Sequence, residues 1–202
     1  INNKSVVLAC EAGTPCISDP GFKLIRKFVE QNLEYTLIPG PSSVINALVL
    51  SGLPTDQFSF YGFVPRKKNA QNKSFENIKN KSRTSIFFES IKRLRETIEN
   101  LSNYLENNRK ISVCREMTKL HEQVITDTCL NILREIDNGN IPLKGEVVLV
   151  IEGTKKIKKD VSIDKKIKDE FLSKMSASDA ARLIALLTKQ NKRDIYKILN
   201  KS

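Results

Sequence analysis

Short apolar runs rich in β-branched residues alternate along this chain with amphipathic patterns of helical period. Such alternation is typical of α/β architecture, in which helices cover a sheet. The connections between the runs are partly short and partly helical, which favours a mixed sheet. The expected strands are residues 5–10, 35–38, 58–63, 84–88, 111–115, 121–125 and 146–151, and the expected helices are residues 21–31, 42–50, 72–79, 91–105 and 130–136.

A break at Gly52-Leu53-Pro54 interrupts this pattern and predicts a domain boundary. We therefore expect two α/β domains, with residues 1–54 as the remainder of an N-terminal domain and residues 55–153 as the second. The chain begins with isoleucine, and residues 5–10 already have the character of a buried strand. We accordingly expect the first strands of the N-terminal domain to be missing from this sequence.

The last quarter of the chain carries most of the net charge of +11. Residues 1–153 hold 20 basic and 17 acidic side chains, whereas residues 154–202 hold 14 basic and 6 acidic ones. We expect a linker over 154–169 and a basic helical module over 170–202, with helices at 178–189 and 193–199 and Ser178 as N-cap. Concentrated positive charge predicts contact with a polyanion. A lysine-rich surface without a partner is the alternative.

The four cysteines form no CxxC pair, and His121 is the only histidine, so no metal site is expected. Unpaired cysteines at the ends of apolar strands suit a reducing compartment, and we expect a cytoplasmic protein. No apolar run approaches the ~20 residues that a membrane-spanning helix requires.

Two loops rich in glycine and proline each follow an expected strand and precede an expected helix. The first is Glu11–Gly21 and the second is Pro39–Ser43. Ligands of open α/β sheets bind beyond the carboxyl ends of the strands, and a helix N-terminus attracts negative charge. The two loops thus predict a nucleotide-like pocket, although tight turns and helix caps would produce the same pattern. Neither loop matches a Walker A or GxGxxG motif.

Six sequence blocks in unbroken order resemble the tetrapyrrole-methylase superfamily. Within it, they are similar to the bacterial 16S rRNA (cytidine-2′-O)-methyltransferases of the decoding region. The blocks are GTPCISDPG, PGPSS, GLPTDQFSFYGFVPRK, SIFFESIKRL, CREMTKLHEQ and KGEVVLVIEG. The resemblance implies two α/β domains with S-adenosylmethionine in the cleft between them, a homodimer, and 16S rRNA in the small ribosomal subunit as partner. One element of the family, a glycine-rich N-terminal strand and loop, has no counterpart here.

The resemblance also implies which residues contact the cofactor. The implied cofactor-binding residues are Gly13, Thr14, Pro15, Ile17, Ser42, Ser43, Glu89, Met117 and Gly145.

Methyl transfer to a 2′-hydroxyl gains from a general base, and carboxylates are the candidates. The candidate bases are Glu89, Glu116 and Glu122. Arg115 and Lys119 are expected to position RNA through its phosphates, although an ordinary Arg–Glu surface pair would fit the same segment. His121 is expected to be a surface histidine.

Two other functions remain open at this stage. A methyltransferase of small tetrapyrroles would also meet a polyanionic substrate. A non-catalytic module that binds RNA or the ribosome would keep the fold without turnover.

Overall fold

The structure is a computed structural model that describes residues 5–10, 13–155, 163–188 and 191–200. The chain falls into two compact units, Ile1–Lys156 and Ile157–Ser202. None of the described helices has the length and apolar character needed to cross a membrane.

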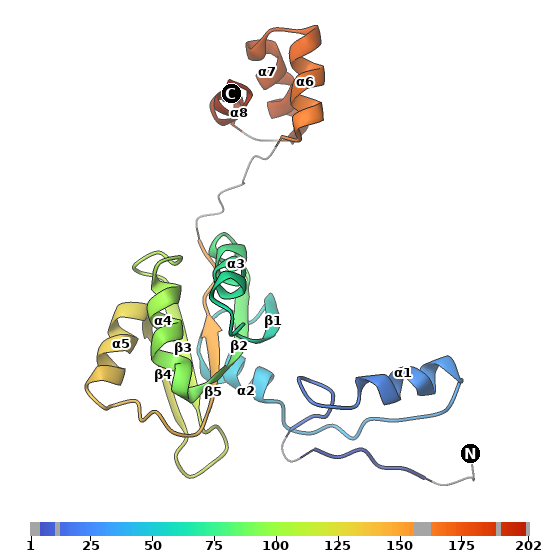
Figure 1. The fold of residues 1–202 in the computed structure, drawn as a ribbon, viewed down its shortest axis with the longest axis vertical. Coiled ribbons are helices and arrows are strands. Elements are labelled where there is room, and N and C mark those ends of the chain that lie inside the picture. Colours follow the sequence, from blue (N-terminus) through green and yellow to red (C-terminus); the bar gives the residue numbers. More distant parts are fainter. Residues whose placement is uncertain (1–4, 11–12, 156–162, 189–190, 201–202) are drawn as a thin grey trace. The chain divides into compact units, whose positions relative to one another are not determined.

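A five-stranded mixed sheet forms the centre of the first unit (Figure 1). Strands β1 and β2 are parallel, and the other neighbours are antiparallel, so the prediction of a mixed sheet is confirmed. The strand order is β1-β2-β5-β3-β4. The bounds are β1 Phe58–Phe63, β2 Thr84–Ser90, β3 Lys110–Arg115, β4 Gln123–Thr128 and β5 Glu146–Ile151.

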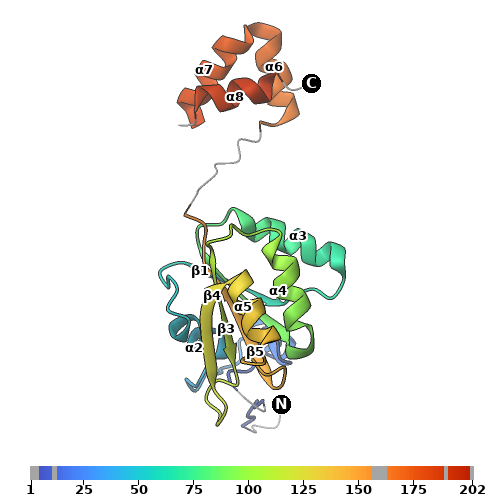
Figure 2. The ribbon, with the colours of Figure 1, turned by 90° about the vertical axis from the view of Figure 1, so that its left-hand side faces the viewer.

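Helices cover both faces of this sheet (Figure 2). Helices α3 (Lys68–Lys79), α4 (Leu94–Ser102) and α5 (Cys129–Asp137) pack on one face, and α2 (Ser43–Leu50) packs on the other. Burial on both faces explains why β5 is a continuous apolar run instead of an alternating one. The predicted division assigns α2 to the N-terminal domain, yet α2 packs on this sheet; a boundary at residue 54 stays a prediction.

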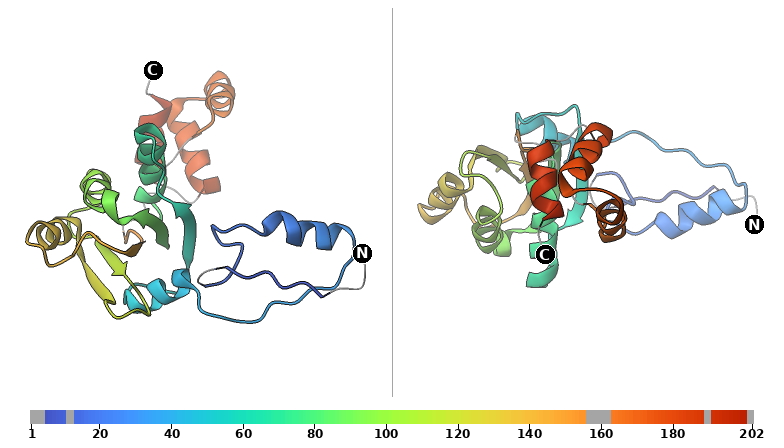
Figure 3. Two further views of the ribbon diagram at one scale, coloured as in Figure 1. Left: turned by 60° about the horizontal axis from the view of Figure 1, so that its bottom comes forward. Right: turned by 90° about the horizontal axis from the view of Figure 1, so that it is seen from above.

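The two strands expected at residues 5–10 and 35–38 are absent, and these predictions are wrong. Among the described residues before α2, only α1 (Phe22–Glu30) is regular, and the other described segments are drawn without strand arrows (Figure 3). A strand forms only where a neighbouring strand supplies hydrogen-bond partners. No described segment pairs with either run, and Val7 and Ile38 are 86% and 85% exposed.

The second unit contains α6 (Lys165–Lys174), α7 (Ala177–Thr188) and α8 (Lys192–Leu199). The last two match the predicted helical pair. Helix α6 begins inside the expected linker, most of whose remainder lies outside the described residues. Ser178 is not the N-cap, because Ser176 precedes α7 and its hydroxyl accepts a hydrogen bond from the Asp179 amide at 3.2 Å. A core of small and branched residues holds the unit together: Ala180, Ala181, Ile184, Ile195 and Leu199.

Candidate functional site

The two glycine- and proline-rich loops, residues 13–21 and 39–43, lie in contact; we call them the Gly-Pro loops. The Thr14 hydroxyl donates a hydrogen bond to the Pro41 carbonyl at 3.3 Å. A side chain on Gly13 would begin 3.5 Å from the same carbonyl oxygen, and Gly13 has a φ of 75°, which favours glycine. The structure therefore brings together two loops whose contacting residues, Thr14 and Pro41, are 27 positions apart in sequence.

Ser42 and Ser43 lie at the start of α2, as predicted. Ser42 is the N-cap in an extended conformation, but its hydroxyl accepts no capping hydrogen bond. The first backbone amides of a helix have no partner within the helix and attract polar or negative groups. Pro15 is half-buried and Ile17 is 45% exposed. The predicted cofactor-binding residues of the Gly-Pro loops thus offer hydroxyls, amides and an apolar surface. None of these predicted residues carries a charged side chain.

A second pair of loops, residues 115–122 and 144–146, lies at one end of β3 and β5; we call them the charged loops. Arg115 is only 8% exposed and joins them. Its guanidinium donates to the carbonyls of Lys144 at 3.0 Å and His121 at 3.1 Å, and to the Gln123 side chain at 3.3 Å. Arg115 therefore holds the two loops at a defined separation. The His121 side chain is exposed, as expected.

Glu116 lies at the centre of the charged loops. Its carboxylate accepts hydrogen bonds from the Glu146 amide at 2.8 Å and from the Lys119 ammonium at 3.0 Å. These bonds, the amide first, hold the pKa of Glu116 below its usual range. Lys119 also binds the Glu146 carboxylate at 3.0 Å, and the two acidic partners raise the pKa of Lys119. Glu116 is therefore ionised over the neutral range and tied to the neighbouring loop.

Gly145 and Met117 complete this arrangement. A side chain on Gly145 would come within 2.5 Å of the Glu116 side chain, and its φ is 96°. Met117 is partly buried against the apolar cluster under α2, which contains Val44 and Leu48. Met117 therefore links the charged loops to the apolar cluster that also holds α2, the helix that begins at the second Gly-Pro loop.

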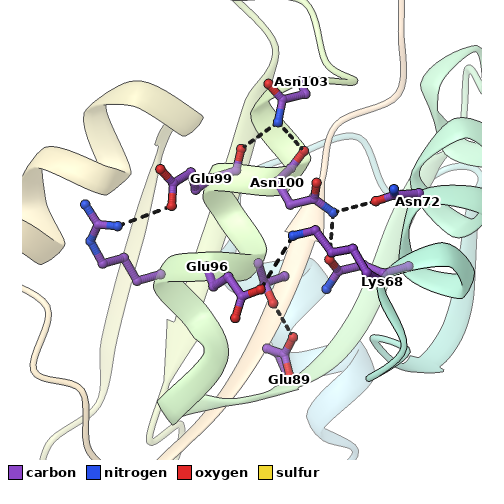
Figure 4. A network of polar contacts seen from close by, with 10 residues as sticks. Lys68, Asn72, Glu89, Glu96, Glu99, Asn100 and Asn103 are labelled. Atoms are coloured by element: carbon purple, nitrogen blue, oxygen red, sulfur yellow. Dashed lines mark hydrogen bonds and ion pairs between the residues drawn. The ribbon is translucent and has the colours of Figure 1, made fainter.

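Glu89 lies elsewhere, on the face of the sheet that α4 covers. It pairs in register with Val147, whose side chain belongs to the core beneath α3, α4 and α5. Its side chain is fully buried, and its carboxylate accepts a hydrogen bond from Arg93 Nε at 3.0 Å. The Thr97 hydroxyl donates a second hydrogen bond at 2.6 Å, which is the dashed line at Glu89 in Figure 4. The structure thus brings Glu116, Lys119 and Gly145 together but surrounds Glu89 with partners of its own.

Several residues in these contacts were not predicted. Arg93 and Thr97 follow Glu89 by four and eight residues and saturate its carboxylate. Glu146 supplies both the amide that binds Glu116 and a carboxylate for Lys119. No spacing in the sequence indicates the contacts between residues 116 and 146, because they depend on β3 and β5 being neighbours. No group of three or more potential metal ligands occurs among the residues described here.

Proteins of similar sequence cover nearly the whole chain. Proteins from Xylella fastidiosa, Haemophilus influenzae and Rickettsia prowazekii are 33%, 35% and 38% identical over 197, 195 and 199 residues. The matches span 97%, 95% and 97% of this chain and 72%, 69% and 70% of the relatives. Each relative bears the name ribosomal RNA small subunit methyltransferase I.

Two solved structures resemble the fold at low sequence identity. The methyltransferase CobJ has a TM-score of 0.52 at 15% identity, and the cobalt precorrin-4 methyltransferase CbiF has 0.50 at 13%. The likeness covers 70% and 69% of this chain, but the chain spans only 62% and 61% of those proteins. The sequence profile described as Tetrapyrrole (Corrin/Porphyrin) Methylases matches residues 2–132, which is more than half of the chain. The chain therefore belongs to the tetrapyrrole methylase family of methyltransferases.

Proposed function

We propose that this protein transfers a methyl group from S-adenosylmethionine to the 2′-hydroxyl of a cytidine in 16S rRNA. One observation carries the proposal: relatives named for methylation of small-subunit ribosomal RNA match 95–97% of the chain, including its C-terminal unit. We further propose a cytoplasmic homodimer.

The charge of the C-terminal unit supports an RNA substrate. Beyond residue 153 the chain carries 14 basic and 6 acidic side chains. A hollow of about 480 Å³ in this unit is lined by Ser178, Lys192, Arg193, Tyr196 and Lys197. Three cations beside a tyrosine suit a nucleotide, because phosphates attract the cations and bases stack on aromatic rings. We propose that this unit holds the RNA.

The chemical groups of the two loop pairs fit S-adenosylmethionine. We propose that the Gly-Pro loops hold it, with Gly13, Thr14, Pro15 and Ile17 forming one wall. The hydroxyls and helix amides at Ser42 and Ser43 suit the polar edges of an amino acid or a ribose. Met117 and Gly145 are proposed for the adenosine side, where Met117 supplies an apolar surface. Glu89, which the resemblance assigns to the same side, would contribute by holding its strand in place. Once bound, the cofactor would supply an electrophilic methyl group.

The proposed reaction needs positioning and removal of a proton. The 2′-hydroxyl loses its proton as it attacks in line, and a well-placed base adds ~10²–10⁴-fold. We propose that Glu116 accepts a hydrogen bond from the 2′-hydroxyl of the target cytidine. We propose that Lys119 binds the adjacent phosphate of the RNA backbone. A carboxylate of lowered pKa is a weak base, so its main contribution would be orientation through hydrogen bonding. Arg115 and Glu89 would act through the loops and strand that they hold.

The decisive experiment supplies labelled S-adenosylmethionine to the complete gene product with unmodified small ribosomal subunits, and in parallel with a precorrin-type tetrapyrrole. We expect label in the ribose of one cytidine, located by ribose-methylation mapping. Label in the tetrapyrrole alone would replace the proposal with small-molecule methylation, which the family description also suggests. Binding of ribosomal subunits without label in either substrate would favour a non-catalytic module.

The variant Lys119→Ala tests whether Lys119 contacts the RNA and not the cofactor. RNA binding should weaken while the affinity for S-adenosylmethionine, measured by calorimetry, stays within about threefold, because a lost phosphate contact costs electrostatic energy only on the RNA side. Loss of cofactor binding in the same variant would contradict the assignment.

A further inference from the structure

Three exposed cations lie at the carboxyl ends of the parallel strands β1 and β2. They are Arg66, Lys67 and Lys92, and we call them the strand-end cations. None of them forms an ion pair with any residue that the structure describes. The carboxyl ends of parallel strands are where α/β proteins bind ligands.

A set of hydrogen bonds brings these cations to one place. The Val64 amide donates to the Phe88 carbonyl at 2.9 Å, and Arg93 donates to the Val64 carbonyl at 2.8 Å. Arg66 follows Val64 by two residues, and Lys92 directly precedes Arg93. The segment after β1 is therefore fixed beside the segment after β2. The buried Glu89 holds Arg93 in place and so stabilises this junction.

The carboxylates near the strand-end cations are already occupied. Glu89 binds Arg93, and Glu96 binds Lys68 at 3.5 Å (Figure 4). Three positive charges therefore remain without a counter-charge. Uncompensated like charges repel one another, and a bound polyanion would remove that repulsion. Helix α3 begins in the same segment and has no acidic residue in its first turn, which adds to the positive field.

An aromatic surface adjoins the cations. Phe63 is 58% exposed and packs its ring edge-to-face on Phe88, with centroids 5.4 Å apart. Rings fixed by a second ring present a rigid face at low entropic cost. Bases of single-stranded nucleic acid stack on such faces with ~1–3 kcal/mol each, whereas a duplex keeps its bases inside.

We propose that the strand-end cations and Phe63 form a binding surface for single-stranded RNA, on which the strand that carries the target ribose rests. This inference rests on the proposed function and deepens it by adding an RNA contact on the first unit, independent of the C-terminal unit. The surface also adjoins the first Gly-Pro loop: a side chain on Gly62 would begin 4.0 Å from the Ser18 hydroxyl. RNA held here would therefore lie beside the proposed cofactor loops.

The test measures how tightly the complete gene product binds a single-stranded RNA over a range of salt concentrations. The RNA has about 12 nucleotides, which is within the usual site size of a surface that binds single strands. The combined variant Arg66→Gln, Lys67→Gln and Lys92→Gln should bind at least tenfold more weakly at low salt. Its slope of log affinity against log salt should be shallower by about 2, because each lost phosphate contact removes ~0.7. Phe63→Leu should weaken binding about fivefold or more with an unchanged slope, since stacking releases no counterions.

Lys81→Gln is the matched control, because Lys81 is exposed and precedes β2, at the opposite end of that strand. Its affinity and slope should equal those of the unmodified protein, and thermal unfolding should verify that every variant is folded. An unchanged slope in the combined variant, an equal change in Lys81→Gln, or no RNA binding by the unmodified protein would each overturn the inference. Methyl transfer to ribosomal subunits is measured in a separate assay. The two assays therefore distinguish failure of the proposed function from failure of the proposed RNA-binding surface.

Discussion

The two loop pairs of the candidate site are built in opposite ways. The Gly-Pro loops touch through one side-chain hydrogen bond of 3.3 Å, from Thr14, and lie among exposed apolar residues. The charged loops are held by three bonds from the buried Arg115 and by the contacts among Glu116, Lys119 and Glu146. The charged loops begin and end on paired strands, whereas the Gly-Pro loops do not. Fixed geometry in this site thus comes from the sheet.

The largest expected contrast is in thiol reactivity. Cys16 is half-buried in the first Gly-Pro loop, whereas Cys114 directly precedes Arg115, is 1% exposed, and has its pKa raised to about 11 by burial. Cys114 can react only when the sheet opens, so an alkylating reagent should modify Cys16 about 10³-fold faster. Mass spectrometry of digested samples over time measures both rates. Cys129, also buried with a pKa of about 11, should react as slowly as Cys114. Similar rates for Cys16 and Cys114 would show that the charged loops open as freely as the Gly-Pro loops.

Arg115→Met should have the largest effect on stability. The substitution removes three hydrogen bonds and leaves the carbonyls of Lys144 and His121 without their partner, which should lower the free energy of unfolding by about 2–4 kcal/mol. Arg26→Met is the control, because the exposed pair of Arg26 with Glu30 should contribute less than about 0.5 kcal/mol. Chemical denaturation measures both. Equal losses would show that Arg115 contributes no more than an exposed ion pair and does not hold the charged loops together.

Gly145→Ala should have a smaller effect that is specific to the charged loops. Alanine is strained at a φ of 96° and would displace the Glu116 carboxylate, at a combined cost of about 2 kcal/mol. Gly139→Ala introduces a similar strain, at a φ of 79°, but meets no atom within 4 Å, so its loss should be about 1 kcal/mol. The difference between the two variants isolates the contact with Glu116. If both lose the same stability, Glu116 moves aside without cost.

Thr14→Val should change stability least among these substitutions. It keeps the shape of the side chain and removes one hydrogen bond at an accessible site, so we expect a loss below about 0.5–1 kcal/mol by thermal or chemical unfolding. A loss as large as that of Arg115→Met would mean that the Gly-Pro loops are braced as strongly as the charged loops.

The pH dependence from Glu116 should be the smallest effect, because solvent screens its ion pair. The pKa of Glu116 is lower in the folded protein than in the unfolded chain, so its contribution is complete above the ordinary pKa of about 4.3 and decreases as the pH falls through the folded value. In Glu116→Gln the stability profile should lose this acid-side component. A variant whose profile between about pH 5 and 3 matches the original would contradict the assignment.

Sequence patterns predicted the second half of the first unit well. The strands at 58–63 and 146–151 have the expected bounds. For β5 the reason is that a strand buried on both faces leaves an uninterrupted apolar run. The edge strand β1 is partly exposed and was recognised from its aromatic residues instead. Helix α6 was not predicted, because its lysines mask a weak apolar pattern. The strand expected at residues 5–10 failed because its apolar residues need a pairing partner that no described segment supplies.

The candidate site was predictable only in part. The resemblance implied that Glu89, Met117 and Gly145 line one side of the cofactor site, and this stays a prediction. Gly145 lies against Glu116, the residue before Met117, whereas Glu89 lies under α4 with partners of its own. Arg115 was expected to face RNA, but its guanidinium is bound to three groups of the protein itself. Its role in positioning RNA stays a prediction. Motif residues could be recognised from their types and order, whereas the direction of a side chain depends on which strands become neighbours.

The sequence by itself determined the α/β class, the mixed sheet, the basic C-terminal unit and the family, because periodicity, composition and motif order are local properties of a chain. The tertiary structure decided that Glu116 meets the amide of residue 146, that Glu89 faces α4, and that Arg66, Lys67 and Lys92 gather without counter-charges. These contacts join segments that are distant in sequence. They exist only after the sheet has set its strand order and register, which no local pattern specifies.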